Sequence, residues 1–216
     1  MSGDQDRQLT DPKAAAERAA GLFRGPTHVI RLGYVTEFPT GHTLTVGDRI
    51  GGEKRGVRLT AERAALLASL NPMVTDREFD AIQMSLLSWM AEQDLLAVVK
   101  SDGALSDLTM ILVMRRDVVL EEILDEGYRV HAGDAEPFVI SELSGYLIQQ
   151  IDGRRTVYQM AENVRKQILG TSEGRQAVAN NEQEQGRSLD SFLLEDVFEL
   201  IGLLLKSGAA TVEPGV

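Results

Sequence analysis

Apolar and polar residues recur along the chain in patterns that predict a mixed α+β protein. Short runs rich in β-branched residues predict strands over 28–35, 43–46, 56–59 and 95–99. Such runs suit the half-buried positions of a sheet. Apolar residues that recur three or four apart predict helices over 61–70 and 76–93, each with one face toward a core. This part of the chain therefore runs from strands through two helices to a closing strand.

The second part of the chain repeats this plan. Strands are predicted over 108–114, 128–131, 137–140 and 209–212, and helices over 142–151, 156–169 and 190–206. Residues 118–125 fit either a strand or a short helix. Residues 170–189 are polar, so they bury too little apolar surface to offset the entropy of ordering them. We expect a mobile insertion there.

The two parts align as an internal duplication. Because both copies would contain one supersecondary unit, the predicted fold is α+β, with two tandem winged helix-turn-helix modules. Each module would contain a small antiparallel sheet and about three helices, over 27–101 and 107–213, behind a flexible tail at 1–26. The aligned pairs are Leu59 with Ile140, Thr60 with Ser141, Leu66 with Leu147, Leu67 with Ile148 and Leu70 with Ile151.

Composition and charge narrow the possible functions. The 216 residues include 33 Asp and Glu against 22 Lys and Arg, and the net charge is −11. An acidic chain repels phosphate backbones and anionic membrane surfaces, so nucleic acid is disfavoured as a partner and no membrane is expected. The absence of cysteine excludes disulfides, cysteine metal sites and thiol catalysis. Without a secretory signal or a membrane-length apolar run, we expect a cytoplasmic protein.

Candidate catalytic and metal-binding residues are scarce. The histidines, His28, His42 and His131, are scattered, and no serine lies in a nucleophile motif. The glycine-rich segment 47–56 lacks the Gly-Lys-Ser/Thr ending of a phosphate loop, so a hairpin is favoured. The acidic run within 121–126 is typical of a solvated surface. We expect no enzymatic activity, no metal and no cofactor.

Residues 137–161 carry a recognisable motif, with the turn Asp152-Gly153-Arg154-Arg155-Thr156 as its most specific part. This segment resembles the PqqD-like family, which includes the peptide chaperone of pyrroloquinoline quinone biosynthesis and the recognition elements of ribosomally synthesised, post-translationally modified peptide (RiPP) pathways. The tandem plan is similar to the paired peptide-clamp regions of azoline dehydrogenases and cyclodehydratase partner proteins. In those proteins a catalytic domain follows where this sequence stops at Val216.

The resemblance implies a peptide-binding site built by strand addition. An extended peptide would pair with the edge of a sheet, and its apolar side chains would enter a channel beside the last helix. Phe198 lies off the main apolar stripe of that helix, so we expect it to line an open groove. The implied peptide-binding residues are Phe138, Val139 and Ile140 on the strand, and Leu193, Val197, Phe198 and Leu200 on the helix.

Together with the scarcity of catalytic candidates, this resemblance implies a non-catalytic protein that binds the leader peptide of a RiPP precursor. It would present the precursor to a partner modifying enzyme of the same pathway. Two alternatives stay open at this point. One is a winged-helix transcription regulator, although the predicted recognition helices are acidic rather than basic. The other is a subunit that is inert alone and completes a modifying-enzyme complex.

Overall fold

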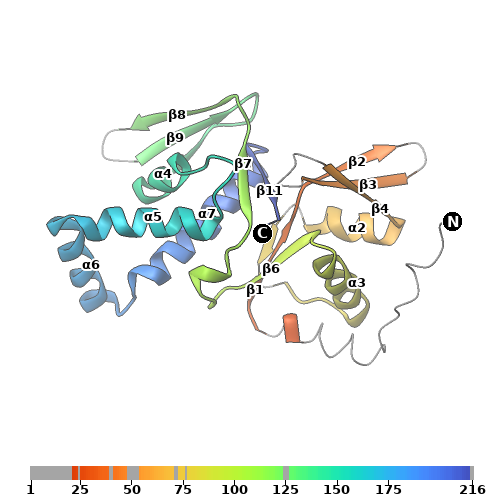
Figure 1. The fold of residues 1–216 in the computed structure, drawn as a ribbon, viewed down its shortest axis with the longest axis horizontal. Coiled ribbons are helices and arrows are strands. Elements are labelled where there is room, and N and C mark those ends of the chain that lie inside the picture. Colours follow the sequence, from red (N-terminus) through yellow and green to blue (C-terminus); the bar gives the residue numbers. More distant parts are fainter. Residues whose placement is uncertain are drawn as a thin grey trace.

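The computed structural model describes residues 21–23, 25–38, 41–47, 54–70, 73–75, 77–123 and 127–214. It confirms the mixed α+β class, with small antiparallel sheets and helices packed beside them (Figure 1). The first half contains β1 (Thr27–Arg31), β2 (Tyr34–Phe38), β3 (Gly41–Gly47), β4 (Lys54–Leu59), α2 (Ala61–Leu70), β5 (Met73–Thr75), α3 (Ala81–Glu92) and β6 (Leu96–Lys100).

A short 3₁₀ turn, Leu105–Asp107, leads into the second half. That half contains β7 (Ile111–Met114), β8 (Val118–Ile123), β9 (Gly127–Ala132), β10 (Phe138–Ile140), α4 (Glu142–Gln149), α5 (Val157–Gly170), α6 (Ser172–Gln185), α7 (Leu189–Lys206) and β11 (Ala210–Glu213).

The two halves share one strand topology. In the first, β1 pairs with β5 and β6, and β2, β3 and β4 form a separate meander. In the second, β7 pairs with β11, and β8, β9 and β10 form the meander. A single bridge between Ile111 and Thr156 stands where the first half has β5. Each half therefore opens with one strand, makes a three-stranded meander and closes on its opening strand.

Helix α7 joins the two halves. Seven of its side chains are buried, and the buried apolar residues of both halves form one continuous cluster. The ring of Phe198 stacks on His28 of β1, with centroids 3.6 Å apart. The amide of Gly33 donates to the carbonyl of Val212 in β11 at 2.6 Å. In Figure 1, β7 and β11 accordingly lie between the β8–β9 sheet and the helices of the first half.

Some predicted boundaries change for local reasons. The strand expected over 28–35 is broken at Gly33, whose φ of 69° suits glycine. The helix expected from residue 76 begins at Ala81, because Asp80 caps it: its carboxylate accepts from the amides of Ile82 and Gln83. The preceding strand β5 was not predicted, since three residues show too little periodicity. Residues 118–123 form strand β8.

The segment 170–189 contains a helix that the sequence analysis did not predict. Thr171 caps α6 by accepting from the amide of Gly174 at 3.0 Å, and Gly186 ends it in the left-handed conformation. No α6 residue is buried, so capping rather than core packing favours this helix. The mobility of the insertion stays a prediction.

Helix content also differs between the halves. Among the described residues the first half contains α2 and α3, and the second contains α4 to α7, where about three helices were expected in each. Most of the tail predicted at 1–26 lies outside the described residues. None of the helices described by the structure has the length and apolar character that a membrane crossing requires.

Candidate functional site

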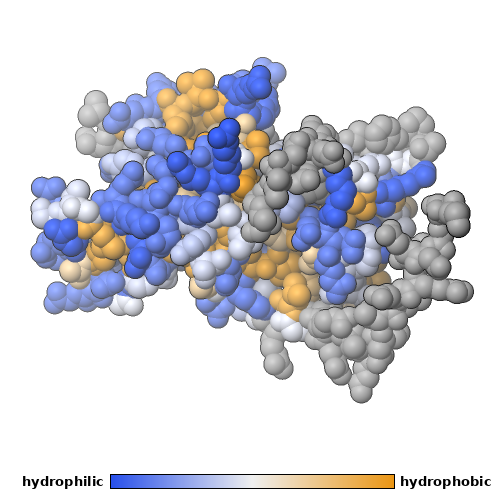
Figure 2. All heavy atoms as spheres, in the orientation of Figure 1, coloured by the Kyte–Doolittle hydropathy of each residue, from blue (hydrophilic) through white to orange (hydrophobic). Residues whose placement is uncertain are grey.

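Strand β10 forms one edge of the β8–β9–β10 sheet. Among the described residues it pairs with β9 alone, with Phe138 opposite Val130 and Ile140 opposite Tyr128. Ile140 is buried and Phe138 is half-buried, whereas Val139 is 50% exposed. Apolar atoms gather over this sheet on the face shown in Figure 2. Val119 on β8, the opposite edge strand, is also an exposed apolar residue. The β10 edge is therefore short, apolar and accessible.

Helix α4 holds the inner face of this sheet in place. Ser141 follows β10 directly and caps α4 by accepting from the amide of Ser144 at 3.0 Å. The ring of Tyr128 lies so close to Gly145 that a Cβ atom there would overlap it. Because glycine has no side chain, α4 can pack closely against the sheet at Gly145. This close packing holds the sheet, and with it β10, in position.

The cap of α4 also connects β10 to α7. The Ser141 hydroxyl donates to the Asp196 carboxylate at 3.0 Å. Burial raises the pKa of Asp196; the Ser141 hydrogen bond opposes this, and the nearby carboxylates of Glu199 and Glu195 reinforce it. This contact holds the end of the edge strand against the middle of α7.

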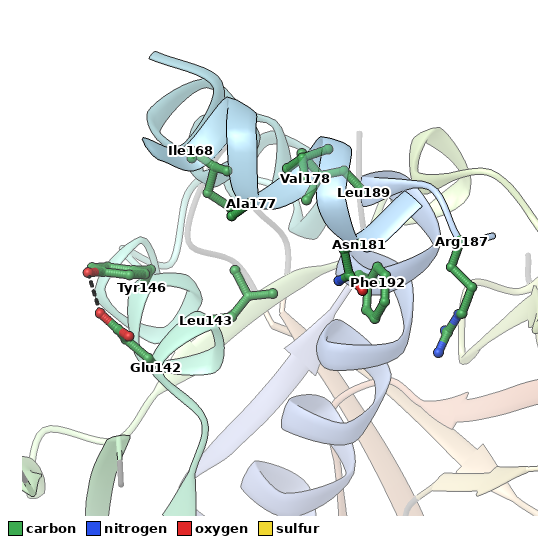
Figure 3. Close-up of a pocket in the computed structure, with 11 residues that line it drawn as sticks. Glu142, Leu143, Tyr146, Ile168, Ala177, Val178, Asn181, Arg187, Leu189 and Phe192 are labelled. Carbon is green, nitrogen blue, oxygen red and sulfur yellow. Dashed lines mark hydrogen bonds between the residues drawn. The ribbon is translucent and has the colours of Figure 1, made fainter. Parts of the chain in front are cut away.

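A cavity of about 310 Å³ opens between α4, α6 and α7 (Figure 3). Its apolar walls come from helices that the sequence pattern alone does not predict to be neighbours. Leu143 lies opposite Val178, and Phe192 closes the α7 side. Because Leu143 is only three residues beyond Ile140, the cavity lies close to the end of β10. Other lining residues are Ile168, Gly174, Ala177, Asn181 and Leu189.

Polar groups stand on two sides of this cavity. The Tyr146 hydroxyl donates to Glu142 at 2.8 Å, drawn as the dashed line in Figure 3, and this bond raises the pKa of Tyr146. Arg187 pairs with Glu195 at 2.5 Å and lies over the Phe192 ring, 4.5 Å from its centroid. Apolar walls with a few polar groups at the rim are typical of a site for an apolar side chain.

A second groove, of about 640 Å³, runs along α7 on the side of the first half. Met73 and His28 contribute to one wall, and Leu194 and Phe198 come from α7. Phe198 is 5% exposed and stacks on His28, so it belongs to the contact between the halves. Phe198 therefore borders a groove between the halves rather than one beside β10, and its role in peptide binding stays a prediction. Phe198→Asp would place a charge in the contact between the halves.

The predicted site residues fall into two groups. Phe138, Val139 and Ile140 lie together on the edge strand. Leu193, Val197 and Leu200 are at most 2% exposed and face the core, because residues at i, i+4 and i+7 form the inner stripe of α7. Leu143, Tyr146 and Phe192, which line the cavity between α4, α6 and α7, were not among the predicted site residues. The spacing of Leu189, Phe192 and Asp196 signals a second face of α7, but its neighbour α6 was not predicted.

The other charged candidates do not converge. No group of three or more His, Asp or Glu side chains suited to a metal ion occurs in the part of the chain that the structure describes. Glu121 contacts His131 at 3.2 Å and Arg129 at 3.1 Å on the open face of the sheet. These hydrogen bonds lower the pKa of Glu121, and the bond with His131 has the larger effect. Asp125 and Glu126 lie outside the described residues.

Comparison with known proteins does not add to this geometry. No family model, curated protein or solved structure matches the chain. The candidate site is therefore defined by its own residues: an accessible edge strand, the Ser141–Asp196 contact at its end and an apolar cavity beside it.

Proposed function

We propose that the chain is a non-catalytic leader-peptide-binding protein of a RiPP pathway. In this proposal its two halves are tandem winged helix-turn-helix modules of the PqqD-like type. It captures the leader peptide and presents the precursor to a partner modifying enzyme. The observation that carries the proposal is strand β10, which among the described residues pairs on one side only.

An extended peptide gains register from such an edge. Main-chain hydrogen bonds fix its position along the strand, and alternate side chains point to opposite faces of the sheet. Val139 offers an exposed apolar contact on one face. Edge strands left unpaired are sites of pairing with other chains, so this strand suits reversible capture of a peptide.

The cavity in Figure 3 would supply selectivity. Glu142 and Leu143 follow Ser141 directly, so a peptide that continues past Ile140 reaches the cavity within a few residues. Its volume of about 310 Å³ is at the small end of ligand pockets and fits one apolar side chain. The backbone would thus provide affinity, and the cavity would select one apolar residue.

Fluorescence polarisation tests the capture step. The probe is a labelled leader segment of the precursor encoded beside this gene, and its scrambled sequence is the control. We expect saturable binding of the leader and none of the scrambled peptide. Absence of saturation at the highest soluble protein concentration contradicts the proposal.

A matched pair of proline variants locates the binding edge. Val139→Pro and Val119→Pro place the same residue in the edge strands β10 and β8 of one sheet, at side chains that are 50% and 59% exposed. Proline removes a backbone donor and is tolerated at edges. We expect at least about tenfold weaker leader binding for Val139→Pro, the effect of about 1.4 kcal/mol. Val119→Pro should bind normally.

Circular dichroism must show the same helix content in both variants. Equal loss of binding from both edges, with the fold intact, would overturn the assignment to β10. The presentation step is tested by gel filtration with the modifying enzyme encoded beside the gene. Co-elution that increases when leader peptide is present supports it, and separate elution under both conditions contradicts it.

A further inference from the structure

The first half contains a cavity that the proposed function does not use. It has a volume of about 420 Å³ and lies between the strands β1, β2 and β3 and helix α2. Arg31, Val35 and His42 reach it from the strands, and four alanines between 61 and 68 form the helix wall. One side of the cavity is thus small and apolar, whereas the other contains a guanidinium group.

The equivalent space in the second half is filled. His42 lies opposite Leu59, the last residue of β4, just as Tyr128 lies opposite Ile140, the last residue of β10. The fourth helix residue beyond is Ala64 after β4 and Gly145 after β10. In the second half the Tyr128 ring packs directly against that glycine. The smaller His42 leaves room in the first half.

Within the part of the chain that the structure describes, Arg31 makes no ion pair, and its Nε atom has no hydrogen-bond partner. Burial lowers the pKa of Arg31. Arg31 pairs with the first residue of β6, and the equivalent position opposite the first residue of β11 is Met114. The second half therefore has an apolar side chain at the position that Arg31 occupies in the first half.

We propose that the first-half cavity binds a carboxylate through Arg31. A guanidinium presents a fork of donors that matches a carboxylate, and it stays charged at physiological pH. A half-buried charge without an ionic partner is unfavourable, so an incoming carboxylate would supply the partner that Arg31 lacks among the described residues. The alanine wall fits a short aliphatic stem. The ligand class is therefore a carboxylate on two to four methylenes, such as a glutamate side chain. This inference does not depend on leader binding.

The test uses the full chain and an isosteric pair of probes. These are N-acetyl-glutamate methylamide and its glutamine counterpart, which differ only in the charge of the side-chain group. NMR of the arginine Nε–H groups reports the contact directly. We expect a saturable shift of the Arg31 signal with the glutamate probe, with a dissociation constant on the order of 1 mM, and none with the glutamine probe. Free butyrate distinguishes a small acid from a peptide side chain.

Two variants and one control decide the outcome. Arg31→Met installs the second-half residue, and exposed Arg116→Met removes the same charge elsewhere. Thermal shift and a fluorescent glutamate probe measure binding in these variants. We expect at least tenfold weaker binding for Arg31→Met and no change for Arg116→Met. Ala65→Leu, which narrows the cavity and keeps Arg31, should also weaken binding. Equal binding of both probes, tighter binding of inorganic phosphate, or no loss in Arg31→Met overturns the proposal.

Discussion

The two halves of the chain share an order of elements but leave different spaces open. The first keeps a cavity between its meander and α2, with Arg31 inside. The second fills that space with Tyr128 against Gly145 and opens a cavity between α4, α6 and α7 instead. A few side chains thus decide where a repeated framework exposes a binding surface. Duplication of the fold does not imply duplication of the site.

The edge strands differ in the same way. Strand β4 carries Lys54, Arg55 and Arg58, and the Arg55 side chain already donates to the carbonyl of Gln93. Strand β10 consists of Phe138, Val139 and Ile140 and carries no charge. An extended apolar peptide would therefore lose less hydration energy at β10, because no charged group has to be covered.

The packing difference predicts the largest effect on stability. A Cβ atom in Gly145→Ala would overlap the Tyr128 ring, and overpacking of this kind costs about 1–3 kcal/mol. We expect a matching decrease in the free energy of unfolding measured in urea. Adding Tyr128→His recreates the His42–Ala64 pair of the first half and should recover most of the loss. A double variant as unstable as Gly145→Ala would show that the halves do not pack equivalently.

The comparison of edges predicts which half binds the leader. Val57 lies within β4 opposite Leu44, as Val139 lies within β10 opposite Arg129. We expect Val57→Pro to bind the labelled leader as the unmodified chain does, whereas Val139→Pro binds at least about tenfold more weakly. Fluorescence polarisation measures both, with circular dichroism as the folding control. Loss of binding in Val57→Pro alone would transfer the site to the first half.

Exchanging Arg31 and its second-half counterpart Met114 should change thermal stability by a smaller amount. Arg31→Met removes a half-buried charge that has no ionic partner among the described residues, so we expect a higher midpoint of thermal unfolding. The increase should stay within about 4 °C, the shift for roughly 1 kcal/mol in a chain of this size. Met114→Arg places such a charge in the second half and should lower the midpoint. Differential scanning calorimetry at low anion concentration measures both, and a lower midpoint in Arg31→Met contradicts the assignment.

Asp196 predicts the smallest effect, which depends on pH. Because the pKa of Asp196 is raised by burial and by Glu199 and Glu195, the folded chain binds its proton more tightly than the unfolded chain does. Stability is therefore lost as pH rises from the ordinary carboxyl range through this raised pKa. Asp196→Asn keeps an acceptor for Ser141 and should be relatively more stable at pH 7 than at pH 3.5. Unfolding midpoints across this range measure the difference, and a constant difference contradicts it.

The sequence predicts local features of the fold better than contacts between distant elements. Ser141 and Thr156 mark the starts of α4 and α5, since both are capping residues before an apolar stripe. Strand β5 and helix α6 were not predicted, because neither segment has apolar residues that recur at a regular spacing. The β10 edge was identified from a motif. The burial of Phe198 could not be predicted from the local sequence, because it depends on the contact with His28 from the other half.

The hydrogen bond between Gly33 and Val212 has a consequence for how the chain can be divided. A cut in the turn at 101–104 would separate β11 from the bend that it supports, and would expose the ring pair of His28 and Phe198 to water. Neither fragment would keep a complete core. The two halves therefore share one core, to which α7 contributes seven buried side chains.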